Sequence, residues 1–371
     1  MRFGNLTYTL THTQIPKAAT NFTYKPMATP ASTMSQVSAD PDAAALSARA
    51  QGDQALDAAQ WLGTGLVRPE CVLATARGDV FTADWRGGVA HLLPDGSQRL
   101  YLGQPLDGEP LKPNGIALCR DGTFLLTHLG AEQGGVFRLH RDGRTEPFLR
   151  HVDGFDLPPT NYVVEDSQGR TWITVSTRLA PRALGYRKTC NDGFIVMVDA
   201  KGARIVGDDL GYTNECAVDP SGQWLYVNET FTRRLSRFAV HNDGSLGPKQ
   251  VVTEFGAGTY PDGLAFDAQG EVWVVSIVSN RVIRVARDGS QTLWLEDAEA
   301  AHLDWVEQAY QASEMGRPHL DGVKSRVLKN ISSLAFAGPD LRTGILGCLL
   351  GEALPMLAMP VAGHPPVHWN Y

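Results

Sequence analysis

The sequence predicts an all-β protein, a six-bladed β-propeller, from three observations. A ten-residue pattern recurs along the chain, strand-length apolar runs follow each copy, and many of the later strands end in a turn of the form xDG. Repeats of roughly 40 to 50 residues that each contain four short strands are typical of propeller blades. An open β-sandwich assembled from the same strands is the alternative architecture.

The repeat becomes visible when PDGLAFDAQG, at residues 261–270, is aligned with the rest of the chain. The matching segments are TNECAVDPSG (213–222), TNYVVEDSQG (160–169), PNGIALCRDG (113–122), PECVLATARG (69–78) and, more weakly, ISSLAFAGPD (331–340). The second position of these copies forms a column of mostly polar side chains: Glu70, Asn114, Asn161, Asn214, Asp262 and Ser332. Successive members are about one blade apart, except for the longer interval between 262 and 332.

Strand and turn signals fill each repeat. Runs such as WLYVNET (224–230) and VWVVSIV (272–278) are rich in the β-branched and aromatic residues that strands favour. Later strands end in PDG, RDG, AKG or NDG, which suit hairpins because glycine tolerates a positive φ. The pattern therefore indicates antiparallel sheets joined by short turns.

Two segments fall outside the repeat. Residues 1–58 are predicted to be an N-terminal extension, with an Ala-rich part that could form a short helix, and residues 59–371 to be the propeller. The excess length before the last copy falls at 296–326, where an acidic, Ala-rich start predicts a helical insertion. One end of the chain must supply a strand that closes the ring, and the sequence does not show which end does so.

Composition limits the classes of partner. The 371 residues are 43% hydrophobic and carry a formal net charge of -7, so there is no basic footprint for nucleic acid. No apolar run is long enough for a membrane span, and the first residues lack the features of a signal peptide, so we expect a cytoplasmic protein. The five cysteines are dispersed without a C-x-x-C pair, which favours reduced thiols over disulfides or a zinc site.

The column itself suggests a metal site. If it lies where the innermost strand of each blade begins, Glu70, Asn161, Asn214 and Asp262 would converge on the central channel. Carboxylate and amide oxygens favour one divalent cation, calcium first and then magnesium or manganese, over zinc. The alternative is that Asn and Asp begin these repeats because they form turns, although Glu70 is a poor turn former.

These motifs resemble the senescence marker protein, gluconolactonase and luciferin-regenerating enzyme-like family over roughly residues 64–371. The similarity is carried by RPE (68–70), TNYVVEDSQGRTW, TNECAVDPSGQWLYV, YPDGLAFDAQGEVWV and ISSLAFAGPDL. The resemblance implies a six-bladed propeller whose single catalytic cation is bound by Glu70, Asn161, Asn214 and Asp262. It also implies hydrolysis of a lactone, with a metal-activated water attacking a metal-polarised carbonyl. Asp262 is the candidate general base as well as a ligand.

Four further residues are candidates for binding the small-molecule substrate. Asn114 could instead cap its turn, Glu215 could point into solvent, and His128 could be an ordinary polar side chain. Arg178 lies on a long loop, 176–188, that also carries Arg182 and Tyr186. This loop could cover the channel and bind an anionic substrate, or carry only solvated surface charge.

Other functions remain open at this point. Sugar-lactone members of the family often carry an arginine two residues before the third-blade Asn, where this chain has Pro159. The alternatives to a lactonase are a phosphotriesterase-like or other propeller enzyme, and a calcium- or ligand-binding propeller without turnover.

Overall fold

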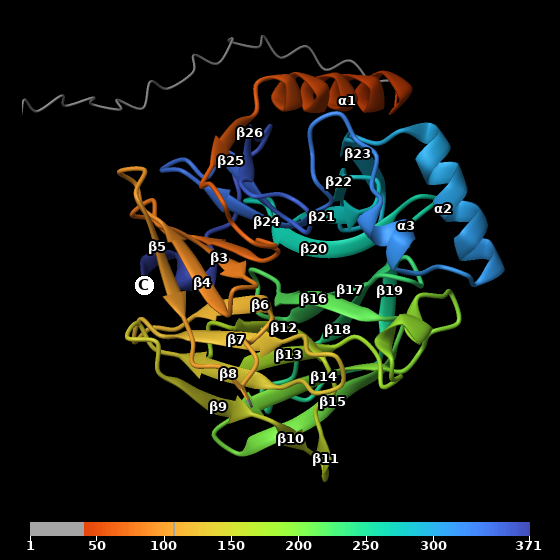
Figure 1. Cartoon of the computed structure of the whole chain (residues 1–371). Coiled ribbons are helices and arrows are strands. Elements are labelled where there is room, and N and C mark those ends of the chain that lie inside the picture. Colours follow the sequence, from red (N-terminus) through yellow and green to blue (C-terminus); the bar gives the residue numbers. More distant parts are fainter. Residues whose placement is uncertain (1–40, 107) are drawn as a thin grey trace, which may run out of the picture. The chain divides into compact units, whose positions relative to one another are not determined.

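The computed structural model describes residues 41–106 and 108–371. The part of the predicted N-terminal extension that precedes residue 41 lies outside the described residues. Within the described part, six four-stranded antiparallel sheets follow one another as the blades of a propeller (Figure 1). The predicted six-bladed β-propeller is therefore confirmed, and the open β-sandwich is excluded.

Each of the first five blades is built from four strands that are consecutive within their sheet. In chain order the strands are β2 (Val72–Ala74), β3 (Val80–Asp84), β4 (Gly88–Leu92) and β5 (Gln98–Leu102); β6 (Pro113–Leu118), β7 (Phe124–His128), β8 (Val136–Leu139) and β9 (Thr145–Leu149); β12 (Thr160–Glu165), β13 (Thr171–Val175), β14 (Gly193–Asp199) and β15 (Gly202–Leu210); β16 (Thr213–Val218), β17 (Trp224–Glu229), β18 (Arg234–Ala239) and β19 (Gln250–Glu254); β20 (Tyr260–Phe266), β21 (Val272–Ile277), β22 (Arg281–Val285) and β23 (Gln291–Leu295). A small hairpin of β10 (His151–Val152) and β11 (Phe155–Asp156) precedes the third blade.

The sixth blade closes the ring with a strand from the N-terminal side. Its order is β1-β26-β25-β24, with β1 (Gln60–Leu62), β24 (Ile331–Ala337), β25 (Thr343–Cys348) and β26 (Leu354–Ala358). β1 pairs antiparallel with β26 and places Trp61 opposite Pro355. The strand that closes the ring therefore comes from the N-terminal side, a point that the sequence did not decide.

The repeat also builds the core. Trp172 and Trp273 occupy equivalent positions in two blades, and both are fully buried. Their indole N–H groups donate to Asp166 and Asp267 at 2.9 and 3.1 Å, in the turn that precedes each tryptophan strand. A buried indole needs such a partner, so the aspartate of the repeat satisfies the tryptophan of the same blade.

A β-bulge lies at the column position in five of the inner strands. The pairing register shifts between Pro113 and Ile116 in β6, and corresponding shifts occur in β12, β16, β20 and β24. A bulge leaves a residue out of the regular ladder and redirects its side chain. The bulges therefore release the column residues from the alternation that would otherwise fix their direction.

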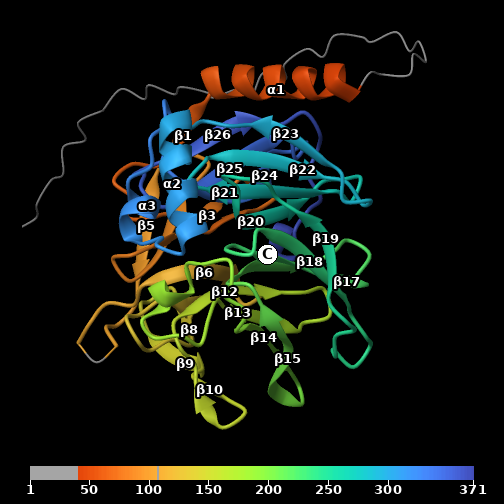
Figure 2. The same ribbon diagram turned by 90° about the vertical axis from the view of Figure 1, so that its right-hand side faces the viewer.

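Helices lie outside the blades. α1 (Pro41–Asp57) runs across β23 and β26 (Figures 1 and 2), and its Ala55 and Leu56 pack with Trp294 and Leu295. The interval 296–326 contains α2 (Ala300–Ala312) and α3 (Arg317–Asp321), and the short helices η1 (Arg182–Gly185) and η2 (Val367–Asn370) lie in loops.

No helix in the described part of the chain is both long and apolar enough to cross a membrane.

Candidate active site

A cavity of about 70 Å³ lies where the inner strands begin. Five members of the polar column line it: Glu70, Asn114, Asn161, Asn214 and Asp262. All five are between 2% and 6% exposed. The structure therefore brings together the four side chains expected to bind the cation and adds Asn114, one of the candidates for substrate contact.

Two amide oxygens at this cavity are buried without a hydrogen-bond donor. Among the described residues, Asn114 Oδ1 and Asn161 Oδ1 accept no hydrogen bond, and the buried Glu70 Oε2 has the Arg68 guanidinium beside it, with Nη2 at 3.1 Å. The amide of Asn114 donates through Nδ2 to the Asn161 carbonyl at 3.2 Å, and Nδ2 of Asn214 donates to Thr230 Oγ1 at 3.0 Å. The amide nitrogens of Asn114 and Asn214 are thus occupied, whereas oxygens are left to bind a ligand. Buried acceptors without a partner are costly, so this arrangement fits a hard cation.

The carboxylates add to this cost. Burial and the neighbouring Glu70 carboxylate raise the pKa of Asp262 well above its usual range, although Arg68 and Arg182 act in the opposite direction. Burial, together with the charges of Asp262 and Glu70, also raises the pKa of Glu215. A nearby positive charge would favour the ionised forms of Asp262 and Glu215.

The residue types fit calcium, magnesium or manganese better than zinc. In residues 41–106 and 108–371, no group of three or more His, Cys, Asp and Glu side chains is placed to hold a metal. The column instead combines two carboxylates with amide oxygens, which is an oxygen-only donor set. Occupation of the channel by a metal stays a prediction.

Three of the residues that the sequence suggested for substrate binding do not line this cavity. Glu215 is 6% exposed and its Oε2 accepts the Leu264 N–H at 3.1 Å, so the alternative that it points into solvent is wrong. Arg178 pairs with Asp208 at 2.9 Å and His128 accepts the Lys112 N–H at 3.1 Å. These three side chains are not among those that line the cavity, which gives no support to direct substrate contact.

Other lining residues were missed by the sequence reasoning. Arg68 and Trp85 come from the first blade, and Arg317 and Leu320 come from α3 in the insertion. Arg68 belongs to the RPE motif with Glu70, so this motif could have indicated that Arg68 lies at the site. The insertion has no counterpart in the other blades, so the repeat does not indicate that Arg317 reaches the cavity.

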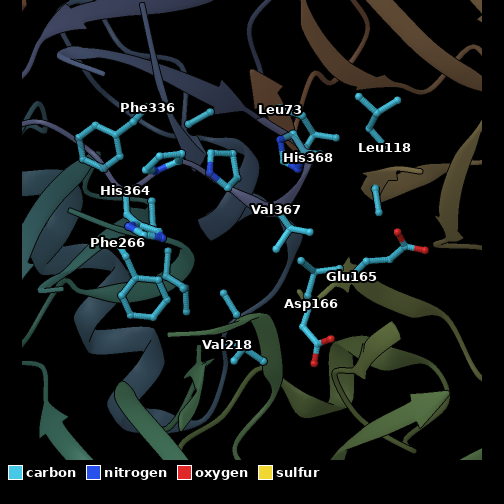
Figure 3. A pocket seen from close by; sticks show the side chains of 18 of the residues that line it. Leu73, Leu118, Glu165, Asp166, Val218, Phe266, Phe336, His364, Val367 and His368 are labelled. Carbon is cyan, nitrogen blue, oxygen red and sulfur yellow. The ribbon is translucent and has the colours of Figure 1, made fainter. Parts of the chain in front are cut away.

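A second, larger cavity lies at the other end of the inner strands. It has a volume of about 210 Å³ and is lined by residues near the strand ends, such as Leu118 and Val218, and by the C-terminal residues 364–368. Figure 3 shows apolar side chains around most of it, with Glu165 and Asp166 on one side. The column residues do not line this cavity, so the candidate active site is at the opposite end of the channel.

Comparison with known protein families shows to which family the chain belongs. The family model described as the SMP-30/Gluconolactonase/LRE-like region matches residues 109–296, which is slightly more than half of the chain. The chain belongs to the SMP-30/gluconolactonase/LRE-like family. The resemblance expected from the blade motifs is therefore confirmed for this SMP-30/gluconolactonase/LRE-like protein.

Individual SMP-30/gluconolactonase/LRE-like relatives agree with this assignment. The 6-deoxy-6-sulfogluconolactonase of Pseudomonas putida is 30% identical over 201 residues, which cover 52% of this chain and 65% of that protein. The match thus spans slightly less than two thirds of the curated relative. Two solved structures share the fold: a gluconolactonase from Xanthomonas campestris (TM-score 0.59, 19% identity, 85% of this chain and 93% of that one) and the calcium-binding protein regucalcin from Agrobacterium tumefaciens C58 (TM-score 0.58, 17% identity, 82% and 96%).

Proposed function

We propose that this protein is a divalent-metal-dependent lactonase whose active site is the cavity at the start of the inner strands. The single observation that carries the proposal is the cluster of buried oxygens on Glu70, Asn114 and Asn161 beside Asp262, in which the two amide oxygens accept no hydrogen bond among the described residues. Family membership and the sulfogluconolactonase relative support a lactone as the substrate. The calcium-binding structural neighbour agrees with an oxygen-only cation site but shows only a shared fold.

Glu70, Asn161, Asn214 and Asp262 would hold the cation. When bound, a divalent cation supplies Lewis acidity toward an ester carbonyl and toward water. The residues around it supply position and proton transfer. The five column residues are almost fully buried. Electrostatic interactions are stronger in such a site than in water.

Asp262 is the residue proposed to accept the proton of the attacking water. It lines the cavity, and its carboxylate lies at the bulge of β20, where the strand ladder does not constrain it. A general base must lie within reach of the water, and it must be in the protonation state that accepts a proton. Burial and Glu70 raise the pKa of Asp262, Arg68 and Arg182 oppose this rise, and a bound cation would further favour the ionised form that accepts the proton.

Asn114 is proposed to orient the substrate. Its Nδ2 is fixed on the Asn161 carbonyl, so its free Oδ1 is held in one direction and can accept a hydroxyl proton of the lactone. Preorganised groups of this kind reduce the cost of fixing the substrate in the reactive geometry.

The test is hydrolysis of a lactone panel by chelated and metal-restored protein. We expect a chelator to abolish hydrolysis, calcium, magnesium or manganese to restore it, and Asp262→Asn to lower kcat by at least about 100-fold, as expected for loss of a general base. Aryl esters and phosphotriesters in the same panel distinguish the other reaction classes. Undiminished lactone hydrolysis after chelation and in Asp262→Asn would overturn the mechanism, and cation binding without turnover of any substrate would indicate a binding protein.

A further inference from the structure

We infer, on the basis of the proposed function, that the substrate of this site carries an anionic group besides its lactone ring, and that Arg182 and Arg317 recognise it. The anion is a sulfonate, phosphate or carboxylate, three groups that bind guanidinium in the same way. Both arginines line the same cavity as the column residues, one from the third blade and one from the helical insertion.

Arg182 is a cation without a carboxylate partner. It is half-buried at the start of η1, and its Nε donates to Tyr212 Oη at 2.8 Å. Among the described residues, Arg182 makes no ion pair with an Asp or Glu, although the Glu70 and Asp262 carboxylates are near enough to act on its charge, and its two terminal nitrogens donate to no protein group. A partly desolvated guanidinium without a counter-ion is unfavourable, whereas a bound anion would satisfy both free nitrogens.

Tyr212 holds Arg182 in a fixed position. Its ring lies 5.4 Å from the Arg182 guanidinium carbon, and it packs on Tyr186 and Phe231 with ring centroids 5.5 and 4.8 Å apart. These three aromatic residues also line the cavity. An arginine that is already fixed by aromatic neighbours loses less side-chain entropy when it binds an anion.

Arg317 approaches from the insertion. It is the first residue of α3, and it pairs with Asp321 on the exposed side, with Nη2 2.6 Å from Oδ1. The insertion is fixed to the propeller, because Val306, Tyr310 and Leu320 pack in one apolar cluster with Tyr212. The insertion therefore places a second guanidinium at the cavity that carries Arg182.

The charges of the residues that line the cavity also favour an anionic ligand. Three guanidinium groups, those of Arg68, Arg182 and Arg317, face two carboxylates, those of Glu70 and Asp262. Arg68 lies 3.1 Å from Glu70 and is therefore balanced within the protein. Arg317 pairs with Asp321, but the lining itself has one guanidinium more than it has carboxylates, and a surplus of positive charge attracts ligands of the opposite sign.

The experiment compares lactones that share one ring and differ at a single substituent. The probes are D-glucono-1,5-lactone, which is neutral, and its 6-deoxy-6-sulfo and 6-phospho counterparts. We expect kcat/KM for at least one charged lactone to exceed that of the neutral one by about tenfold or more, the size of one charge-assisted hydrogen bond. Arg182→Gln and Arg317→Gln should each lower this ratio about tenfold, whereas Arg182→Lys should lower it less.

A matched control and a second readout keep the outcomes separate. Arg204→Gln removes a third-blade arginine that pairs with Asp199 and does not line the cavity, so it should leave the ratio unchanged. Calorimetry with 6-deoxy-6-sulfogluconate, the ring-opened acid, measures anion binding without turnover, and Arg182→Gln should weaken it about tenfold. Hydrolysis of the neutral lactone with no preference for either charged one would overturn this inference and leave the proposed function standing. Anion binding without hydrolysis of any lactone would overturn the proposed function and leave the anion site standing.

Discussion

Arg68 Nη2 lies 3.1 Å from Glu70 Oε2, and the same guanidinium stacks on the Trp85 ring at 4.4 Å from its centroid. Both residues line the candidate active site. Arg68 therefore offsets the charge of one proposed metal ligand from within the protein. A cation bound to Glu70 would lie close to this guanidinium and be repelled by it.

The first prediction follows from that repulsion. Arg68→Gln should tighten calcium binding about tenfold, because it removes a positive charge next to the site while leaving the oxygens in place. Isothermal titration of the chelated protein with calcium measures the change in Kd. Weaker binding in Arg68→Gln would mean that Arg68 positions Glu70 rather than opposing the cation.

Gly347 supports the site from outside the cavity. A Cβ at this position would lie 1.8 Å from the Glu70 carbonyl oxygen and 2.4 Å from Ser333 Oγ, so an added methyl group would displace the backbone of Glu70. We expect Gly347→Ala to weaken calcium binding at least tenfold and to lower Tm, both measured on the same preparation. Gly256→Ala is the control, because its Cβ would meet no atom within 4 Å, and it should change neither quantity.

A partly buried ion pair fixes the insertion to the propeller. Arg233 Nη2 donates to Glu307 Oε2 at 2.5 Å and to Tyr260 Oη at 2.7 Å, and its guanidinium carbon lies 3.7 Å from the Tyr310 ring centroid. Arg233→Met should lower the free energy of unfolding by about 3 kcal/mol, because Glu307 and the Tyr260 hydroxyl lose their partner. Cleavage by a protease within 296–326 should become faster.

The control for this change is Arg326→Met. Arg326 pairs with Asp57, and both side chains are more than half exposed, so removal should cost less than about 0.5 kcal/mol. Denaturant unfolding measures both variants. An equal effect of the two substitutions would show that Arg233 does not anchor the insertion.

Acid should destabilise the protein in part through His128. Burial, assisted by Lys112 and Arg150, lowers the pKa of His128 to about 4. The unfolded chain, with an ordinary histidine pKa of about 6.5, binds this proton first, so stability is complete above about pH 6.5 and falls between pH 6.5 and 4. His128→Asn should remove up to roughly 2 kcal/mol of that loss, measured by urea unfolding at pH 7 and pH 4.5. An unchanged pH dependence in His128→Asn would contradict the assignment.

Much of the fold and part of the site could be predicted from the sequence because they repeat. Aligning blades placed Glu70, Asn161, Asn214 and Asp262 in one column, and equivalent positions in successive blades meet at one end of the channel. The repeat carried no information about side chains that occur once. Arg317 reaches the cavity from an insertion without a counterpart in other blades, so no alignment within the chain could place it.

The sequence pattern also could not predict the direction in which individual side chains point. The bulges in the inner strands follow from backbone register, which the alternation of polar and apolar residues does not specify. Glu215 looked like a residue that could point into solvent, yet it is buried and accepts the Leu264 N–H. Arg178 and Arg182 share one loop, but Arg178 pairs with Asp208 whereas Arg182 lines the cavity.

The most direct test of the central claim is a calcium titration of chelated wild-type protein beside Asp262→Ala and Asn161→Leu. Both side chains line the cavity, and Asn161 Oδ1 accepts no hydrogen bond among the described residues. If the buried oxygens form a cation site, wild-type protein will bind one equivalent of calcium per chain, and each variant will bind at least about 100-fold more weakly. Absence of binding by wild-type protein, or binding that both variants retain unchanged, would contradict the proposed metal site.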